Sequence, residues 1–312
     1  MISSGDQVDR DQSESPLRWL APRVTTASEA VRWACLLEAT SPKAGNVSPG
    51  VSFSDLCYID FVKASDLASD AFAAHGTFGK AVFEAAKATS EACQSNVNLG
   101  ILLLLGPLVA ADNLLVDRVV NSPTPEDWLG AVSDVFSAMD QKDQQSIYRA
   151  IAVANAGGLG KVESWDVNQT HERVDLLAAM ADAAGRGDRI ALQYQTGFLD
   201  LFQEVIPVLL GAIQEAGDVL HGVMQSQLRI LASSHDSLIM RKNGEAVAEE
   251  VRVAASGITN LDPLQYARFD RTLRAEAGNR LNPGTTADLI AAGLFVILRT
   301  MPEARAGDLE VG

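Results

Sequence analysis

Hydrophobic residues recur at helical spacing along most of the chain, with polar residues between them. The clearest case starts at Thr26, which with Glu29 forms a capping box, a pattern typical of a helix start. We predict a helix from there to Ala39, ended by Pro42, because proline removes a backbone donor and clashes with the preceding turn. Its apolar stripe consists of Ala30, Trp33, Ala34 and Leu37.

Most of the remaining chain shows the same periodicity. We predict further helices near 55–75, 77–94, 98–118, 125–139, 143–155, 170–184, 188–215, 217–233, 244–256, 263–277 and 285–300. No alternating run of β-branched residues is long enough for a sheet, so the predicted fold class is all-α. Without a fixed-period repeat or a central linker, we predict a single large multi-helix domain, with two packed helical halves as the alternative. The domain covers 17–303, between a disordered acidic tail at 1–16 and a C-terminal tail at 304–312.

One segment, 99–111, is apolar enough to raise the question of a membrane span. Its apolar run is shorter than the roughly 20 residues that cross a bilayer, and Pro107 interrupts it. We therefore predict a buried central helix that is kinked or broken at the proline.

Charge narrows the classes of partner. Forty Asp and Glu residues against 25 Lys and Arg give a formal charge of −15, which disfavours nucleic-acid backbones and anionic membranes. A nucleotide can still bind where a few cations gather against this field. Lys43, Lys161, Arg241 and Lys242 are candidates on that ground.

The cysteines and the N-terminus indicate a compartment. Cys35, Cys57 and Cys93 fall in apolar helical stretches without Cys-x-x-Cys spacing, so we predict buried, reduced thiols. The first 15 residues lack the cationic start and apolar stretch of a signal peptide. We predict a cytoplasmic protein.

Candidate chemistry lies in loops next to helix ends, where backbone N–H groups can meet an anion. In the loop 41–54, Lys43 could contact a phosphate, and Gly45 before Asn46 would let the backbone approach it. Taken alone, this loop also fits an ordinary helix-breaking turn with a solvated lysine.

A second loop holds Gly157, Gly158 and Gly160, which lack the full dinucleotide fingerprint and could simply close the preceding helix. Downstream lies the densest titratable cluster. It suits a charge-stabilised imidazole or a divalent cation, or else an acid-rich helix start. Its members are Asp166, His171, Glu172 and Asp175.

The third and fourth loops contain His235 and Asp236 with Arg241, and the stretch 282–288. In the latter, Thr285 or Thr286 is expected to cap the last long helix and leave its first turn open to an anion. Structural capping accounts for either loop taken singly.

Together these loops occur in the order and spacing of a known family. The chain resembles the triphosphoribosyl-dephospho-CoA synthases over about 28–300, most closely the shorter archaeal and bacterial variants. The stretches that carry the resemblance are EATSPKAGNVSPG, FSDLCYIDF, NVNLGILLLLGPLVAA, YRAIAVANAGGLG with WDV, HDSLIMRKNG, and NPGTTADL.

The resemblance implies an all-helical transferase that joins the triphosphoribosyl unit of ATP to a ribose hydroxyl of 3′-dephospho-CoA and releases adenine. Cleaving that N-glycosidic bond passes through an oxocarbenium-like state, so the site needs a stabilising carboxylate and an acid for the leaving base. His171 or a carboxylate would take the hydroxyl proton. The candidate acids are Asp55, Asp166, Asp175, Asp236 and Asp288.

The triphosphate must be held without hydrolysis, which calls for Mg²⁺, a cation and backbone N–H groups. We predict that Asp166 and Asp175 bind the metal ion. The predicted substrate- and phosphate-binding residues are Lys43, Gly45, Asn46, Asn98, Gly100, Gly157, Gly158, Gly160, Arg241, Gly284, Thr285, Thr286 and Asp288.

The chain departs from the better-known members of the family in three places. In the stretch 51–57, which includes Phe53 and Cys57, only Asp55 is kept, while Leu159 replaces an arginine and Val97 a threonine. Two alternatives therefore stay open. One is a divergent nucleotide-dependent transferase with another acceptor, for example in pterin-linked one-carbon metabolism, and the other is a non-catalytic helical binding protein.

Overall fold

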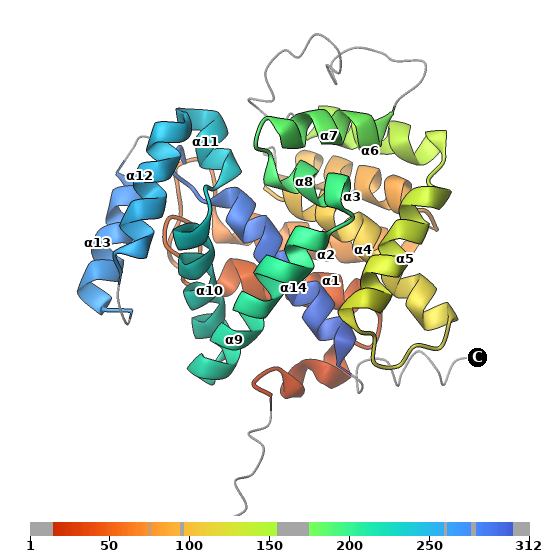
Figure 1. The fold of residues 1–312 in the computed structure, drawn as a ribbon, viewed down its shortest axis with the longest axis horizontal. Helices are drawn as coiled ribbons and strands as arrows, with labels where there is room; N and C mark the ends of the chain where they lie inside the picture. Colours follow the sequence, from red (N-terminus) through yellow and green to blue (C-terminus); the bar gives the residue numbers. More distant parts are fainter. Residues whose placement is uncertain are drawn as a thin grey trace, which may run out of the picture.

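The computed structural model describes residues 15–74, 76–93, 97–154, 175–258, 261–275 and 279–301. The predicted all-α fold is confirmed, because these ranges contain helices and turns but no sheet, only one isolated bridge between Ser48 and Val51. Helix α14 (Gly284–Thr300) runs through the middle of the molecule (Figure 1). Helices α10 to α13 lie on one side of it and α3 to α8 on the other.

The described part of the first half of the chain forms seven elements, with one long loop between α1 and α2. The capping box at Thr26 is confirmed: the N–H of Thr26 donates to the Glu29 carboxylate at 3.0 Å, and the N–H of Glu29 donates to Thr26 Oγ1 at 3.3 Å. The elements are a 3₁₀ turn η1 (Arg18–Arg23), α1 (Ala27–Thr40), α2 (Tyr58–Ala74), α3 (Phe78–Cys93), α4 (Leu99–Asp117), α5 (Pro125–Ala138) and α6 (Gln141–Val153).

Helix α4 is the apolar segment of the chain, and it packs against α3, α5 and α14. By length and composition alone it could cross a membrane, but 72% of its most apolar window is buried inside the protein. The predicted buried helix is confirmed, and of the two outcomes expected at Pro107, a kink or a break, the break does not occur, because the helix continues through the proline. Pro107 leaves the carbonyl of Leu103 without its helical donor, and the Tyr194 hydroxyl donates to that carbonyl at 2.7 Å.

The second half departs from the prediction at 188–215, where the single expected helix is broken. The chain turns at Gly197 and Phe198, both at positive φ, and the two parts of the helix meet at 112°. The elements are α7 (Leu176–Gly185), α8 (Arg189–Thr196), a π-helical turn η2 (Leu201–Val205), α9 (Ile206–Ala216) and α10 (Val219–Ser233).

The last part of the chain adds one helix that the sequence did not predict, α11, which lies in the expected loop after 233. Its seven residues are too few to show a period. The elements are α11 (Ser237–Asn243), α12 (Glu245–Ser256), α13 (Pro263–Arg274) and α14.

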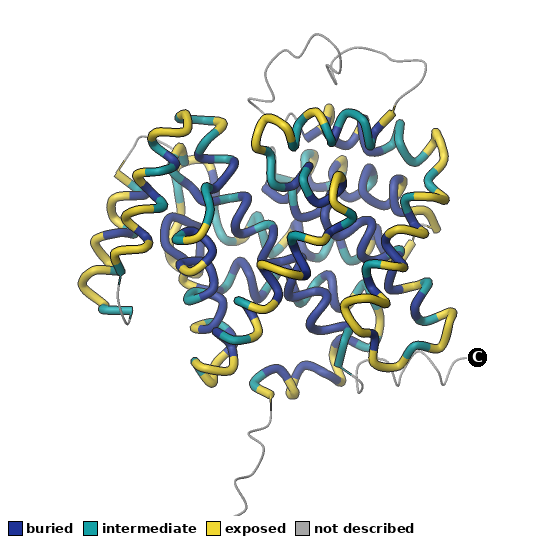
Figure 2. Tube along the Cα trace, in the orientation of Figure 1, coloured by how far each residue is buried: buried dark blue, intermediate teal, exposed yellow. Residues whose placement is uncertain are grey.

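Buried residues alternate with exposed ones along most helices (Figure 2). The buried hydrophobic residues form one large core and two small ones. The large core joins α1 to α10 and α14. A second core lies among α10 to α13, and a third, around Val47, Leu56 and Val97, lies under the loop after α1. The loop after α1 and the first turn of α14 therefore lie where separate cores meet.

The cysteine prediction is confirmed only in part. All three thiols are free, but only Cys35 is buried. Cys57 and Cys93 are partly exposed, and Cys57 precedes α2 instead of lying inside a helix. The Cys57 thiol donates to the Asp60 carboxylate at 2.8 Å, so this thiol lies in a polar environment and not in the apolar one that we predicted.

Candidate active site

A cavity of about 330 Å³ opens where the loop after α1, the first turns of α4 and α14, and the last turn of α11 meet. Its apolar lining residues include Leu56, Phe61 and Met180. The predicted binding residues that line it are Asn46, Asn98, Gly100, Arg241, Gly284, Thr285 and Asp288. Loops that are far apart in the sequence thus come together at one site.

Asp288, in α14, lines this cavity and has a strongly shifted pKa. Its carboxylate lies against Gly100 of α4, so closely that a Cβ at position 100 would lie 2.0 Å from Asp288 Oδ2. Within the described ranges, no hydrogen bond or ion pair reaches this carboxylate. Burial, and then the charges of Glu38 and Asp236, raise the pKa of Asp288 well above its usual value, so it favours the protonated form.

Glu38, in the last turn of α1, is the second acid of the cavity wall. Its side chain is 4% exposed and its Oε1 lies 2.8 Å from Lys43 Nζ. The ammonium also donates to the backbone carbonyl of Glu38. Lys43 itself is 1% exposed and does not line the cavity, so it reaches the site through Glu38. A buried cation paired in this way compensates a carboxylate and has little reach toward a phosphate.

Gly45 and Asn46 lie in the same loop as Lys43, and of these two only Asn46 lines the cavity. Gly45 adopts φ 70°, and a Cβ there would lie 2.8 Å from the side chain of Leu273 in α13, so close packing requires the glycine. The Nδ2 of Asn46 donates to Asn282 Oδ1 at 2.6 Å, and its own Oδ1 accepts from Gln227 at 2.7 Å. Asn46 therefore joins the loop after α1 to α10 and to the turn before α14.

Asp236 does not line the cavity but holds two of its elements together. Its Oδ1 caps α11, and its Oδ2 accepts from the N–H and the hydroxyl of Thr286, each at 2.8 Å. Burial raises the pKa of Asp236, and these hydrogen bonds oppose the rise. The prediction that Thr285 or Thr286 caps α14 is wrong: Pro283 occupies the N-cap without a side-chain bond, and Asp236 supplies the acceptor from a neighbouring helix.

Two predicted acids lie at the margin of the cavity. Asp55 is exposed and accepts from Asn279 Nδ2 at 2.9 Å, and Asn279 lines the cavity. Asp175 is exposed at the N-cap of α7, where it accepts from the Ala178 N–H at 3.0 Å. Neither carboxylate is among the described residues that line the cavity.

Seven candidate residues lie outside the described ranges, namely Gly157, Gly158, Gly160, Lys161, Asp166, His171 and Glu172. Among the residues that are described, no group of three or more His, Cys, Asp or Glu side chains could hold a metal ion. Binding of Mg²⁺ by Asp166 and Asp175 stays a prediction.

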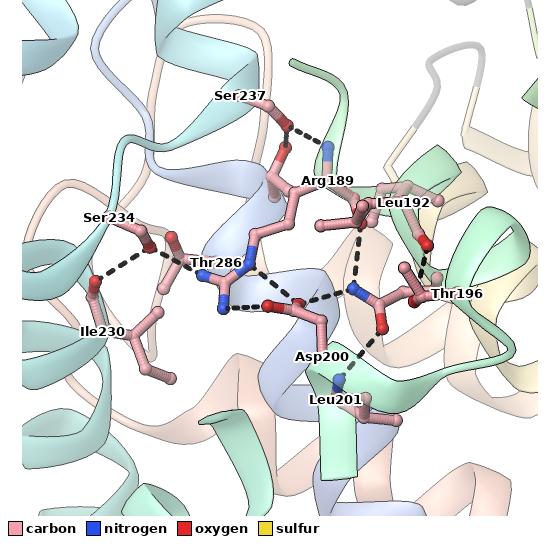
Figure 3. Close-up of polar contacts among 12 residues, drawn as sticks. Arg189, Leu192, Thr196, Asp200, Leu201, Ile230, Ser234, Ser237 and Thr286 are labelled. Atoms are coloured by element: carbon pink, nitrogen blue, oxygen red, sulfur yellow. Dashed lines mark hydrogen bonds and ion pairs between the residues drawn. The ribbon is translucent and has the colours of Figure 1, made fainter. Parts of the chain in front are cut away.

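A polar network fixes the helices behind the cavity (Figure 3). The Arg189 guanidinium donates to both carboxylate oxygens of Asp200, at 3.0 and 3.1 Å, and to Ser234 Oγ at 2.7 Å. Gln193 donates to Asp200 at 2.6 Å and accepts from the Leu201 N–H at 3.0 Å. The sharp break between α8 and α9 is thus tied to the end of α10.

The same network reaches the cavity through Ser237. The N–H of Arg189 donates to Ser237 Oγ at 3.3 Å, and the Ser237 hydroxyl donates to Thr285 Oγ1 at 2.9 Å. Thr285 lines the cavity one turn before Asp288. The start of α14 is therefore held from two sides, by Asp236 and by Ser237.

Comparisons with known proteins show the family to which the chain belongs. The model of the CitG family, ATP:dephospho-CoA triphosphoribosyl transferase, matches residues 24–306. The chain belongs to this family. A crystal structure of an Archaeoglobus fulgidus protein provisionally named a triphosphoribosyl-dephospho-CoA synthase has the same fold, with a TM-score of 0.61 and 23% sequence identity. The match covers 78% of this chain and 98% of that one. No curated protein matches.

The family makes this chain a transferase whose reaction uses ATP and dephospho-CoA. The comparisons lend no support to another acceptor or to a non-catalytic binding protein. Sequence reasoning about this synthase-like chain missed Glu38, Asp188 and Asn279, all of which line the cavity. The sequence did contain a signal for Glu38. An acid in the last turn of a helix lies at the negative end of the helix dipole, which is unfavourable unless a cation compensates the charge.

Proposed function

We propose that the cavity is where the triphosphoribosyl group passes from ATP to dephospho-CoA, and that Asp288 and Glu38 handle the two protons of this transfer. The observation that carries the proposal is the contrast between these neighbouring carboxyl groups. Asp288 has a raised pKa and no partner among the described residues, whereas Lys43 stabilises the charge of Glu38. Two carboxyl groups in such different environments suit an acid and a base.

In this proposal, the bond breaks between N9 of adenine and the anomeric ribose carbon of ATP, which is called C1″ because of its place in the product. The 2′-hydroxyl oxygen of dephospho-CoA forms the new bond to C1″. Asp288 donates its proton to the leaving adenine, and Glu38 accepts the proton of the attacking hydroxyl. The negative charge of Glu38 also stabilises the oxocarbenium-like transition state. Proton transfer from Glu38 to Asp288 then restores the starting state.

The cavity offers complementary surfaces for the substrates. Its apolar lining residues, among them Leu56, Phe61 and Met180, suit a flat base, while the amide of Asn98 has an Nδ2 that is buried without a partner in the described structure. A buried amide donor of this kind is available to a substrate oxygen or ring nitrogen. We further propose that Mg²⁺ enters as part of the ATP substrate, since a cation bound with phosphates needs only one or two protein carboxylates.

The experiment that tests this function is chromatographic detection of adenine released from ATP and Mg²⁺, with and without dephospho-CoA. We expect release that depends on dephospho-CoA and a coupled product that contains the intact triphosphate. Release that does not depend on the acceptor, or no release at all, would contradict the proposal.

Glu38→Gln tests the base within the same assay. Loss of a general base lowers kcat by about 10²- to 10⁴-fold. Glu215→Gln is the matched control, because Glu215 is a surface acid that also pairs with a cation, Arg229. We expect the control to keep the wild-type kcat, and an equal loss in both variants would remove Glu38 from the mechanism.

A further inference from the structure

Three cations line the cavity in a chain whose formal charge is −15, namely Arg186, Arg241 and Lys242. Arg241 and Lys242 come from the last turn of α11, and Arg186 comes from the C-cap of α7. Cations placed together against the net charge of a protein raise the local concentration of an anion. The contacts of each of these three side chains show whether a nearby carboxylate already compensates its positive charge.

Lys242 is a half-buried cation whose contacts are neutral. Its ammonium donates to Asn279 Oδ1 at 2.6 Å and to the Asn279 carbonyl at 3.3 Å. No carboxylate pairs with it in the described part of the chain. Burial, followed by the adjacent charge of Arg241, lowers the pKa of Lys242, so an anion bound here would relieve both effects.

Arg241 is only loosely engaged. A single contact of 3.3 Å joins its Nη1 to Asp188 at the start of α8, which leaves most of the five donors of the guanidinium for another acceptor. Arg186 pairs with Asp182 on its own helix, a surface contact that contributes little. A planar guanidinium and a compact ammonium side by side suit the oxygens of phosphate groups.

The position of these cations relative to the acids points to one part of the substrate. The charge of Arg241 partly offsets the raised pKa of Asp288, so the two groups are near enough to interact across the cavity. In ATP the triphosphate is carried by the same ribose whose C1″ would react at Asp288. A subsite for the triphosphate beside Asp288 would therefore hold that ribose in place for the transfer.

We propose that Arg241 and Lys242, assisted by Arg186, form the subsite for the triphosphate of ATP. This assignment rests on the proposed function, and it replaces Lys43, whose charge Glu38 compensates. The triphosphate keeps its charge throughout the transfer, so the subsite binds the ground state and the transition state about equally. Its loss therefore affects KM for ATP more than kcat.

Calorimetric titration with inorganic tripolyphosphate tests the subsite without catalysis. We expect Arg241→Met and Lys242→Met each to raise Kd about 10- to 100-fold, the range for losing a charge-assisted hydrogen bond. Lys242→Arg should keep most of the affinity because it keeps the charge. Lys142→Met is the matched control, since Lys142 is an exposed lysine that does not line the cavity. An unchanged Kd in both cavity variants would overturn the subsite.

Steady-state kinetics then identify which substrate the subsite holds. We expect Lys242→Met to raise KM for ATP by a larger factor than it lowers kcat. A rise in KM for dephospho-CoA alone would overturn the assignment to ATP, because that substrate also carries a diphosphate. Wild-type protein that binds tripolyphosphate but releases no adenine would contradict the proposed function and leave the subsite standing.

Discussion

The two ends of α14 treat an ionisable side chain in opposite ways. Near the C-terminal end, Arg299 is 1% exposed, and its Nε donates to Asp112 of α4 at 2.8 Å. Its Nη1 donates to the carbonyls of Val24 and Thr25 at 3.0 and 2.8 Å. Near the N-terminal end, Asp288 faces the same helix α4 and has no such partner among the described residues.

The difference separates stability from chemistry on one helix. A buried ion pair with its remaining donors satisfied is costly to break, because either partner alone would be an uncompensated charge. A carboxyl group left without a partner beside a cavity keeps its proton at a higher pH, which is the property of a catalytic acid. Helix α14 thus anchors the fold at one end and carries the proposed chemistry at the other.

The largest effect should come from breaking the stabilising end. Arg299→Met leaves the Asp112 carboxylate buried without its cation, so we expect the free energy of unfolding to fall by about 3–5 kcal/mol. Urea unfolding followed by circular dichroism measures this change. Arg118→Met is the control, since Arg118 and Asp134 are 49% and 55% exposed, and it should stay within about 0.5 kcal/mol of the wild type.

A middle-sized effect is expected in the network behind the cavity. Arg189→Met removes both contacts to Asp200 and the contact to Ser234, so we expect a loss of about 2 kcal/mol in the free energy of unfolding. Arg189→Lys keeps the charge but not the two-pronged geometry, and it should recover only part of the loss. Full recovery by lysine would show that charge alone matters at this position.

The smallest effect sharpens the comparison at the catalytic end. Because folding raises the pKa of Asp288, the native state binds more protons than the unfolded state between the usual and the raised value. The wild type therefore loses stability as pH rises through this window. The variant Asp288→Asn does not lose stability in this way, because its side chain does not ionise. At neutral pH we therefore expect its free energy of unfolding to exceed that of the wild type by more than the ~0.5 kcal/mol typical of surface changes.

Thermal melts at several pH values test this prediction. The stability gain of Asp288→Asn should shrink as pH falls and vanish below the usual pKa of an aspartic acid, where both proteins carry a neutral group. The groups that act on Asp288 are Glu38, Asp236, Asp188 and Arg241. A gain that is the same at every pH would mean that burial of charge is not its cause.

The sequence predicted much of the fold because local signals decide it. The capping box at Thr26 and the apolar periodicity placed most helices correctly. The errors arose where tertiary contacts override local signals: the Tyr194 hydroxyl lets α4 continue through Pro107, and Arg189 with Asp200 stabilises the break at Gly197 and Phe198. Phe198 at positive φ in this break gives no warning in the sequence.

The candidate site was predictable to a lesser degree. Asn46 and Arg241 were found because polar groups and glycines stand out in segments that lack a helical period in the sequence. Glu38 was missed because it lies inside a helix, and Lys43 was given a direct phosphate contact because a sequence does not show that a cation is already paired. Which charges are compensated depends on the packing of distant segments.

The measurement that tests the account most directly is kcat for adenine release by Asp288→Asn and Asp112→Asn, at a temperature at which both variants are folded. These variants make the same chemical change in α14 near its N-terminal end and in α4 at the carboxylate that pairs with Arg299 near the C-terminal end of α14. We predict that Asp288→Asn loses about 10²- to 10⁴-fold in kcat while it stays at least as stable as the wild type. Asp112→Asn should be destabilised and keep its kcat. Equal losses of kcat in the two variants would contradict the division of α14 into a stabilising and a catalytic end.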